Sequence, residues 1–190
     1  MKILFFGNHS VGVKVLETIL KEDEIVGVVA HPKDAEDGIR YLSVYDFAIS
    51  KKLNVIRGSA KDSKVIEFSH HCSPDLIWIT DYRYLIPKEI INTPSLGAIN
   101  LHPSLLPKYC GRASINWAIL HGEKDLGLTA HYVDEGMDTG DIIKQITFRL
   151  NQNQDVGDAL NILYPLYEQI TRYILECLRS GNISRTPQQL

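Results

Sequence analysis

The segment KILFFGNHSVGVKVLETILKEDEIVGVVAH, residues 2–31, contains two apolar runs separated by a stretch with helical spacing. Residues 2–7 and 24–31 are rich in large and β-branched apolar side chains, which predicts two buried strands. The stretch between them has apolar residues three and four positions apart, namely Val15, Leu16, Ile19 and Leu20. That spacing predicts a helix, and a strand, a helix and a second strand in this order form a parallel β-α-β unit.

The alternation of strands and helices continues through the first half of the chain. We expect helices at 41–51 and 61–71 and further strands at 54–57, 75–80 and 97–102. Because these strands are largely apolar, they are typical of a parallel sheet that is covered by helices on both faces.

The second half of the chain has a different pattern. A helix is predicted at 113–121, and two strands at 126–133 and 142–150 are separated only by a turn, which favours an antiparallel pair. A helical period then runs over 156–180, and the tail after it shows little structural signal. We therefore predict an α/β, Rossmann-like fold with a mostly parallel sheet and an antiparallel addition in the second half.

The composition is that of a globular protein. The chain has 190 residues, 44% hydrophobic and 23% charged, so residues 1–190 are sufficient for one substantial domain. The net charge of −3 disfavours a nucleic-acid partner, because proteins that bind nucleic-acid backbones usually carry a basic excess. No apolar stretch is long enough to cross a membrane, and three widely spaced cysteines favour a reducing, cytoplasmic location.

Two segments are rich in side chains that could take part in catalysis or ligand binding. In GAINLHPSLLPKYCG, residues 97–111, Asn100 and His102 lie at the end of a predicted strand and are expected to face the same side. Ligands bind beyond such strand ends in open parallel sheets. The second segment, 134–141, places four carboxylates between two strands. An amide donor, an imidazole and a carboxylate suit acyl or proton transfer, although such residues are more often ordinary turn and core residues.

Other features favour structural roles. Residues 7–12 follow the first strand as a phosphate loop would, but they lack a complete GxGxxG, so NAD binding is not expected. The run His70-His71-Cys72 has no partners at ligand spacing, which favours a structural role over a metal site. We also expect Trp78 and Trp117 to belong to the core.

The paired motifs N-L-H-P-S-L-L-P-x-Y-x-G-R, at 100–112, and M-D-T-G-D-I-I, at 137–143, resemble the folate-dependent formyltransferase family. The resemblance extends from about Met1 to about Gln188. It implies a catalytic trio of Asn100, His102 and Asp138, with 10-formyltetrahydrofolate as the formyl donor and no metal.

The resemblance also implies binding residues. Contacts to the folate are expected from two segments and one cation: Tyr84, Leu85 and Ile86; Asp134, Glu135, Gly136 and Met137; and Arg112. Residues that line the acceptor site are expected at Asn8 and His9. The family contains members with a further domain, so this chain is either a minimal single-domain member or a fragment of a longer enzyme, and a homodimer is an open alternative.

The acceptor is expected to be a nucleotide-linked aminosugar. Residues 82–87 and 107–117 are similar to the sugar-nucleotide branch of the family, although Pro103 and Cys110 depart from its pattern. Methionyl-tRNA formyltransferases carry a basic insertion after the second strand, where this chain has Asp34, Glu36 and Asp37, which would repel a phosphate backbone. The alternatives are a phosphoribosylglycinamide formyltransferase and a formyltetrahydrofolate hydrolase or folate-binding domain.

Overall fold

A computed structural model describes residues 1–33, 35 and 40–189 of the chain. These residues form two compact units, 1–100 and 101–190, each of which is described by itself. The acidic residues Asp34, Glu36 and Asp37, on which the argument against a tRNA acceptor depends, lie outside the described residues.

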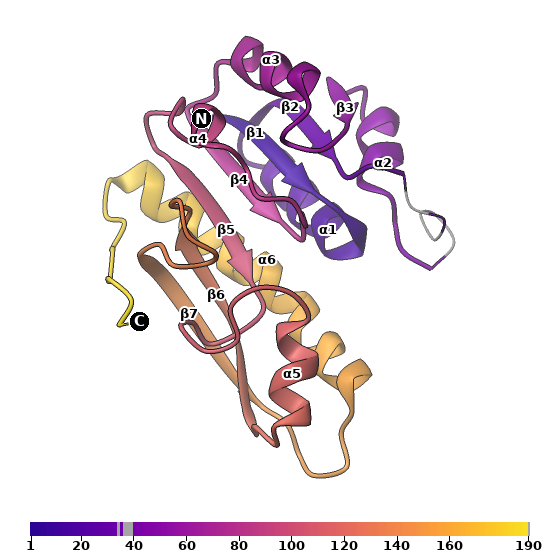
Figure 1. Ribbon diagram of the computed structural model, residues 1–190, viewed down its shortest axis with the longest axis vertical. Helices are drawn as coiled ribbons and strands as arrows, with labels where there is room; N and C mark the ends of the chain where they lie inside the picture. The colour runs from indigo at the N-terminus through magenta and orange to yellow at the C-terminus, as the bar shows by residue number, and fades with distance from the viewer. Residues whose placement is uncertain (34, 36–39, 190) are drawn as a thin grey trace. The chain divides into compact units, whose positions relative to one another are not determined.

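The first unit contains parallel strands in the order β3-β2-β1-β4 (Figure 1). Its strands are β1 (Lys2–Gly7), β2 (Glu24–Ala30), β3 (Val55–Arg57) and β4 (Leu76–Thr80). Its helices are α1 (His9–Leu20), α2 (Val44–Ser50), α3 (Ser63–Cys72) and the short α4 (Lys88–Ile91). The predicted β-α-β alternation is therefore confirmed, whereas α4, a single turn that follows Pro87, was not predicted.

The order of these strands explains why both faces are covered. The chain moves outward from β1 to β3 and then crosses back to β4 on the other side of β1. Right-handed crossovers consequently place α1 and α2 on one face and α3 on the other. The core between these layers is apolar and includes the fully buried side chains of Phe5, Leu16 and Trp78, as expected for Trp78.

The second unit is built around an antiparallel pair, β6 (Asp125–Tyr132) and β7 (Ile142–Arg149), as predicted. Strand β5 (Ala98–His102) spans the boundary between the units, and the complete strand order is β3-β2-β1-β4-β5-β6-β7. The fold is thus α/β and Rossmann-like, with a mostly parallel sheet and antiparallel strands at its end.

Two helices complete the second unit, namely α5 (Ser114–Leu120) and α6 (Val156–Ser180). Helix α6 packs against β6, β7 and α5. It begins with a capping box, in which the Asp155 side chain accepts hydrogen bonds from the N–H groups of Gly157 and Asp158, and it ends at Gly181 in the left-handed conformation.

Two features of the second unit differ from expectation. The side chain of Trp117 is 53% exposed, so the prediction that it belongs to the core was wrong. Helix α5 is short and turns Ile115 and Ala118 inward, which leaves Trp117 on its outer face. The tail after α6 also returns to the sheet: the N–H of Thr186 donates to the carbonyl of Ile142 at 2.9 Å, and the reverse bond is 2.8 Å (Figure 1).

Neither a membrane span nor a metal cluster is found in the part of the chain that the structure describes. None of its helices combines the length and apolarity needed to cross a bilayer. No group of three or more metal-ligating side chains comes together within it. His70 instead contacts the carbonyl of Glu89 at 2.9 Å, which is a structural role.

Candidate active site

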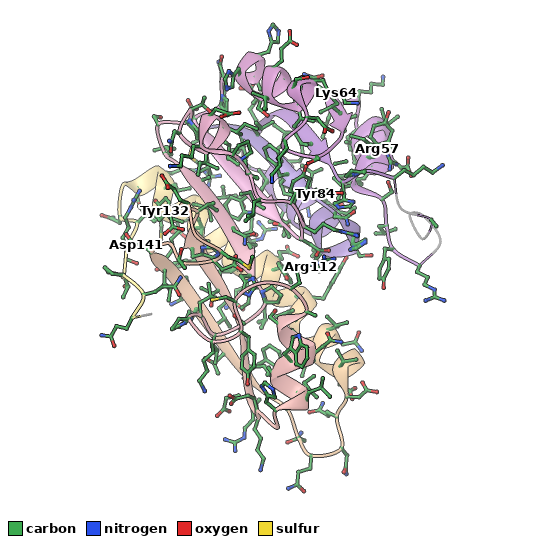
Figure 2. All side chains as sticks on the ribbon, in the orientation of Figure 1. Arg57, Lys64, Tyr84, Arg112, Tyr132 and Asp141 are labelled. Atoms are coloured by element: carbon green, nitrogen blue, oxygen red, sulfur yellow. The ribbon has the colours of Figure 1, made fainter. Side chains whose placement is uncertain are left out.

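The turn between β6 and β7 carries the acidic segment. At its base the N–H of Tyr132 donates to the carbonyl of Asp141 at 2.9 Å, and both residues are labelled in Figure 2. Within the turn, the Asp134 carboxylate accepts hydrogen bonds from the N–H of Gly136 at 3.0 Å and the hydroxyl of Thr139 at 2.7 Å. Asp134 therefore shapes the turn through its side chain.

Asp138 has a different environment from its acidic neighbours. Its backbone is in the left-handed region, with φ of 58°, and its carboxylate is only 14% exposed. One carboxylate oxygen accepts a 2.8 Å hydrogen bond from the N–H of Gly111 and lies 3.5 Å from Nδ1 of His102. The other oxygen lies 3.4 Å from Nε2 of His131. Asp138 is thus a largely buried carboxylate between two imidazoles.

His102 lies at the end of β5, and its side chain is 7% exposed. Its Nε2 lies 2.9 Å from the carbonyl oxygen of Tyr109. Because a carbonyl only accepts hydrogen bonds, Nε2 carries a proton and Nδ1 faces Asp138. The loop 103–111 therefore fixes the ring at Nε2 through Tyr109 and supplies the Gly111 N–H to Asp138.

Burial and charge shift the pKa values of this pair. Burial lowers the pKa of His102, although the Asp138 carboxylate and the Tyr109 carbonyl oppose the shift. Burial by itself would raise the pKa of Asp138, but the hydrogen bond from His131 and the charge of His102 help to hold that pKa below its usual value. Asp138 is consequently ionised at neutral pH, beside an imidazole that can exchange a proton with it.

His131 is a residue that the sequence analysis missed. It lies on β6, is almost completely buried, and its Nδ1 donates to the carbonyl of Tyr132 at 2.8 Å. Its sequence context is that of an ordinary buried strand position, so only the close pairing of β6 with the turn reveals it. A proton on Nε2 of this ring would face Asp138.

The structure brings together some of the predicted site residues. His102 and Asp138 are in contact, and Asn100 lies two residues before His102 on the same strand and is half-buried. Arg112, labelled in Figure 2, is exposed, as are the side-chain positions that precede Asp138 in the turn: Asp134, Glu135, Gly136 and Met137.

The other predicted residues belong to the first unit. Asn8 is buried, and its side-chain Nδ2 lies 3.1 Å from Nε2 of His9. His9 in turn contacts the Asp81 carboxylate at 2.8 Å through Nδ1. Tyr84, also labelled in Figure 2, stacks on His31 with 5.0 Å between the ring centroids.

The two remaining folate candidates, Leu85 and Ile86, follow Tyr84 in the same loop after β4. Leu85 is 57% exposed, an unusual position for an apolar side chain that serves only packing. The first unit thus gathers polar and aromatic side chains at the carboxyl ends of β1, β2 and β4, where parallel sheets bind ligands.

A largely buried carboxylate between two imidazoles, near the carboxyl end of a strand in an α/β sheet, is an arrangement suited to group transfer with proton exchange. Comparison with known proteins specifies the class of enzyme. Residues 1–163 match the family model described as formyl transferase, and the chain belongs to this family.

The chain is similar to several methionyl-tRNA formyltransferases. It is 36% identical over 193 residues to the methionyl-tRNA formyltransferase of Clostridioides difficile strain 630, an alignment that covers 99% of this chain and 62% of that protein. The corresponding enzyme of Clostridium tetani is 37% identical over 168 residues, which cover 86% of this chain and 54% of the relative. This chain therefore spans about three-fifths of the length of such relatives.

Solved structures share the fold. A sugar 3N-formyltransferase crystallised with dTDP and 5-N-formyl-THF has a TM-score of 0.79 at 22% identity, and the match covers 100% of this chain and 66% of that one. A phosphoribosylglycinamide formyltransferase from Bacillus halodurans has a TM-score of 0.76 at 22% identity, with 89% and 90% coverage. At this level of identity the likeness supports the fold and does not distinguish between acceptors.

Proposed function

We propose that this chain transfers a formyl group from 10-formyltetrahydrofolate to an amine. The observation that carries the proposal is the buried Asp138 carboxylate held between His102 and His131 in a member of the formyl transferase family. Amine attack on a formyl carbon places negative charge on the formyl oxygen and requires the nitrogen to lose a proton. The site offers groups for both tasks.

The proposed roles follow from the chemistry of each side chain. Asn100 donates a hydrogen bond to the formyl oxygen as its negative charge develops. His102, whose Nε2 donates to the Tyr109 carbonyl in the free protein, would donate to the formyl oxygen after exchanging that bond when the donor binds. Asp138 orients the His102 ring and accepts the proton that leaves the amine. Removing one donor to an oxyanion typically slows a reaction by roughly 10² to 10³.

Each unit has an exposed apolar side chain among the positions that the resemblance implies for folate contact. A pterin ring has flat apolar faces and a polar edge, which suit exposed apolar side chains beside backbone hydrogen-bonding groups. Leu85 in the first unit and Met137 in the second are 57% and 55% exposed. The donor would supply the formyl carbon.

We propose a nucleotide-linked aminosugar as the acceptor. The resemblance of residues 82–87 and 107–117 to the sugar-nucleotide branch supports this choice, as do the polar and aromatic side chains at the strand ends of the first unit. His9, paired with Asp81 and 4.5 Å from the ring of Tyr41, offers the mixture of polar and aromatic groups that sugars require. The net charge of −3 also favours a small acceptor over a nucleic acid.

Methionyl-tRNA is the second candidate acceptor. The observation in its favour is the 36% identity to an enzyme of that name. This chain and that relative are similar across 99% of the present sequence, so the alternative is tested beside the first.

The experiment is an acceptor screen. The chain is incubated with 10-formyltetrahydrofolate and, separately, a dTDP- or UDP-linked aminosugar, methionyl-tRNA, glycinamide ribonucleotide or buffer, and release of tetrahydrofolate is measured. We expect release only with an aminosugar. Release with methionyl-tRNA or glycinamide ribonucleotide alone would replace the acceptor, and release in buffer would indicate a hydrolase.

A cytoplasmic location and a homodimer remain predictions.

A further inference from the structure

Residues 184–188, which follow α6, form a strap over the turn that carries Asp138. Thr186 pairs with Ile142 in both directions, and the Ser184 hydroxyl donates to the carbonyl of Ile143 at 3.2 Å. The Arg185 guanidinium lies 3.6 Å from the centre of the Tyr132 ring. These contacts attach the strap to the last residue of β6 and the first residues of β7, the two ends of the turn.

Gln188 extends from this strap into the turn. Its side-chain Nε2 donates to the carbonyl of Asp138 at 2.8 Å and to the carbonyl of Gly140 at 2.7 Å. An amide nitrogen has two hydrogens, so both are used on these carbonyls. The bonds join Asp138 to a side chain fifty residues later in the sequence.

Two carbonyls two residues apart, aimed at one point, repel each other unless a donor lies between them. The amide of Gln188 is that donor, and it fixes the orientation of the peptide groups that follow Asp138 and Gly140. Asp138 is in the left-handed conformation, which is uncommon for non-glycine residues. We call the two hydrogen bonds from Gln188 the clamp; they help to hold the backbone of Asp138 in this conformation.

The other atom of the Gln188 amide indicates that the clamp has a cost. Its Oε1 is buried without a hydrogen-bond partner among the residues described. An unsatisfied buried acceptor is unfavourable by about 1–3 kcal/mol.

We infer that Gln188 is a positioning residue for catalysis. It clamps the carbonyls of Asp138 and Gly140 and so directs the Asp138 carboxylate toward His102 and His131. Gln188 lies beyond residues 1–163, which match the family model, so membership of the family does not assign it this role. The inference rests on the proposed function for its effect on turnover, but the geometry that it predicts can be measured without turnover.

The test compares three variants of the full 190-residue chain. Gln188→Met keeps the length of the side chain and removes its donors, and Gln188→Glu keeps its shape and replaces donors by acceptors. Gln189→Met is the matched control, because Gln189 is the same residue type, adjacent and exposed. Nitrogen-15 NMR of the histidine rings reports the surroundings of His102 and His131 in each protein.

We expect both ring signals to shift in the two Gln188 variants and to keep their wild-type positions in Gln189→Met. With the acceptor found in the screen, kcat should fall by about 10- to 100-fold while KM stays near its wild-type value, because small displacements of a catalytic group have effects of this size. A folded Gln188→Met protein with unshifted His102 and His131 signals would overturn the inference, whether or not the wild type transfers a formyl group. Absence of turnover in the wild type would instead refute the proposed function.

If the variants do not fold, a measurement on the wild-type protein tests the clamp instead. The side-chain amide protons of Gln188 should exchange slowly with solvent and show nuclear Overhauser contacts to the turn at 138–140. Rapid exchange without such contacts would refute the clamp.

Discussion

At the scale of single residues, the protein distinguishes one carboxylate from several near neighbours. Asp134 uses its side chain to fold the turn, whereas Asp138 presents its carboxylate to His102 and His131. The difference arises from burial and from the Gly111 N–H, which the loop 103–111 delivers to Asp138. Their roles therefore follow from position, since the two residues have the same chemistry.

Asn100 tests the proposed stabilisation of the formyl oxygen. We expect Asn100→Ala to lower kcat by roughly 10² to 10³ because one oxyanion donor is lost. Asn116→Ala, which changes an exposed asparagine on α5, is the control and should retain full turnover. Steady-state kinetics with 10-formyltetrahydrofolate and the acceptor identified in the screen measure both, and normal turnover by Asn100→Ala would exclude the role.

The lowered pKa of His102 predicts a pH-dependent stability. A histidine whose pKa is lower in the folded state binds fewer protons there than in the unfolded state, so acid favours unfolding. The stability that it contributes is present above its unfolded pKa of about 6.5 and is lost as the pH falls through the folded pKa. His102→Asn should therefore reduce the loss of stability on going from about pH 7.5 to about pH 5.5.

Urea denaturation midpoints at both pH values measure this effect. His71→Asn, at an exposed position on α3, serves as the control for replacing a histidine. Equal pH dependence in the wild type and in His102→Asn would contradict the burial argument.

At the scale of elements, the turn between β6 and β7 depends on close backbone approach. A Cβ at Gly140 would collide with the carbonyl oxygen of Tyr132, so only glycine allows the turn to close there. The turn is supported from the other side by Gln188. The close approach of the strands and the bonds from the strap thus hold Asp138 in position together.

The N-terminal cap of helix α6 is expected to contribute measurably to the stability of the protein. Its N-cap Asp155 accepts two backbone hydrogen bonds, so Asp155→Ala should lower the free energy of unfolding by about 1 kcal/mol. Asn153→Ala, at an exposed position before the helix, is the control. Urea denaturation measures both, and an unchanged stability in Asp155→Ala would show that the cap contributes nothing.

The sequence predicted most elements because strand and helix periods are local properties. The apolar runs of β1 and β4 and the long period of α6 could be identified without tertiary information. Trp117 could not be placed, because a helix of two turns has too few residues to define its buried face. His131 and Gln188 were missed because their significance depends on contacts with Asp138 that arise only when distant segments pair.

The candidate site likewise could be predicted from local motifs only in part. The motif at 100–112 singled out Asn100 and His102, and the acidic run contained Asp138, but the spacing alone did not separate Asp138 from Asp134. Folding does so by burying one carboxylate and leaving the other exposed. The roles of Tyr84, Leu85 and Ile86 remain predictions.

At the scale of the whole molecule, the chain is a member of the formyl transferase family that spans 62% of the length of one such relative. The proposed donor should bind to the folded protein and stabilise it. We expect 5-formyltetrahydrofolate at 100 times its dissociation constant to stabilise the chain by about 2.7 kcal/mol. A thermal melt measures the increase in Tm, and an unchanged Tm at every concentration would contradict folate binding.

The central claim is that Asp138 accepts a proton while a formyl group moves to an amine. It is tested most directly by the single-turnover rate of formyl transfer in Asp138→Asn, which keeps the size of the side chain and removes its charge. We predict a fall of about 10² to 10⁴ relative to the wild type, the usual contribution of a general base, with binding of 5-formyltetrahydrofolate retained. A wild-type rate in a folded Asp138→Asn protein would contradict the account.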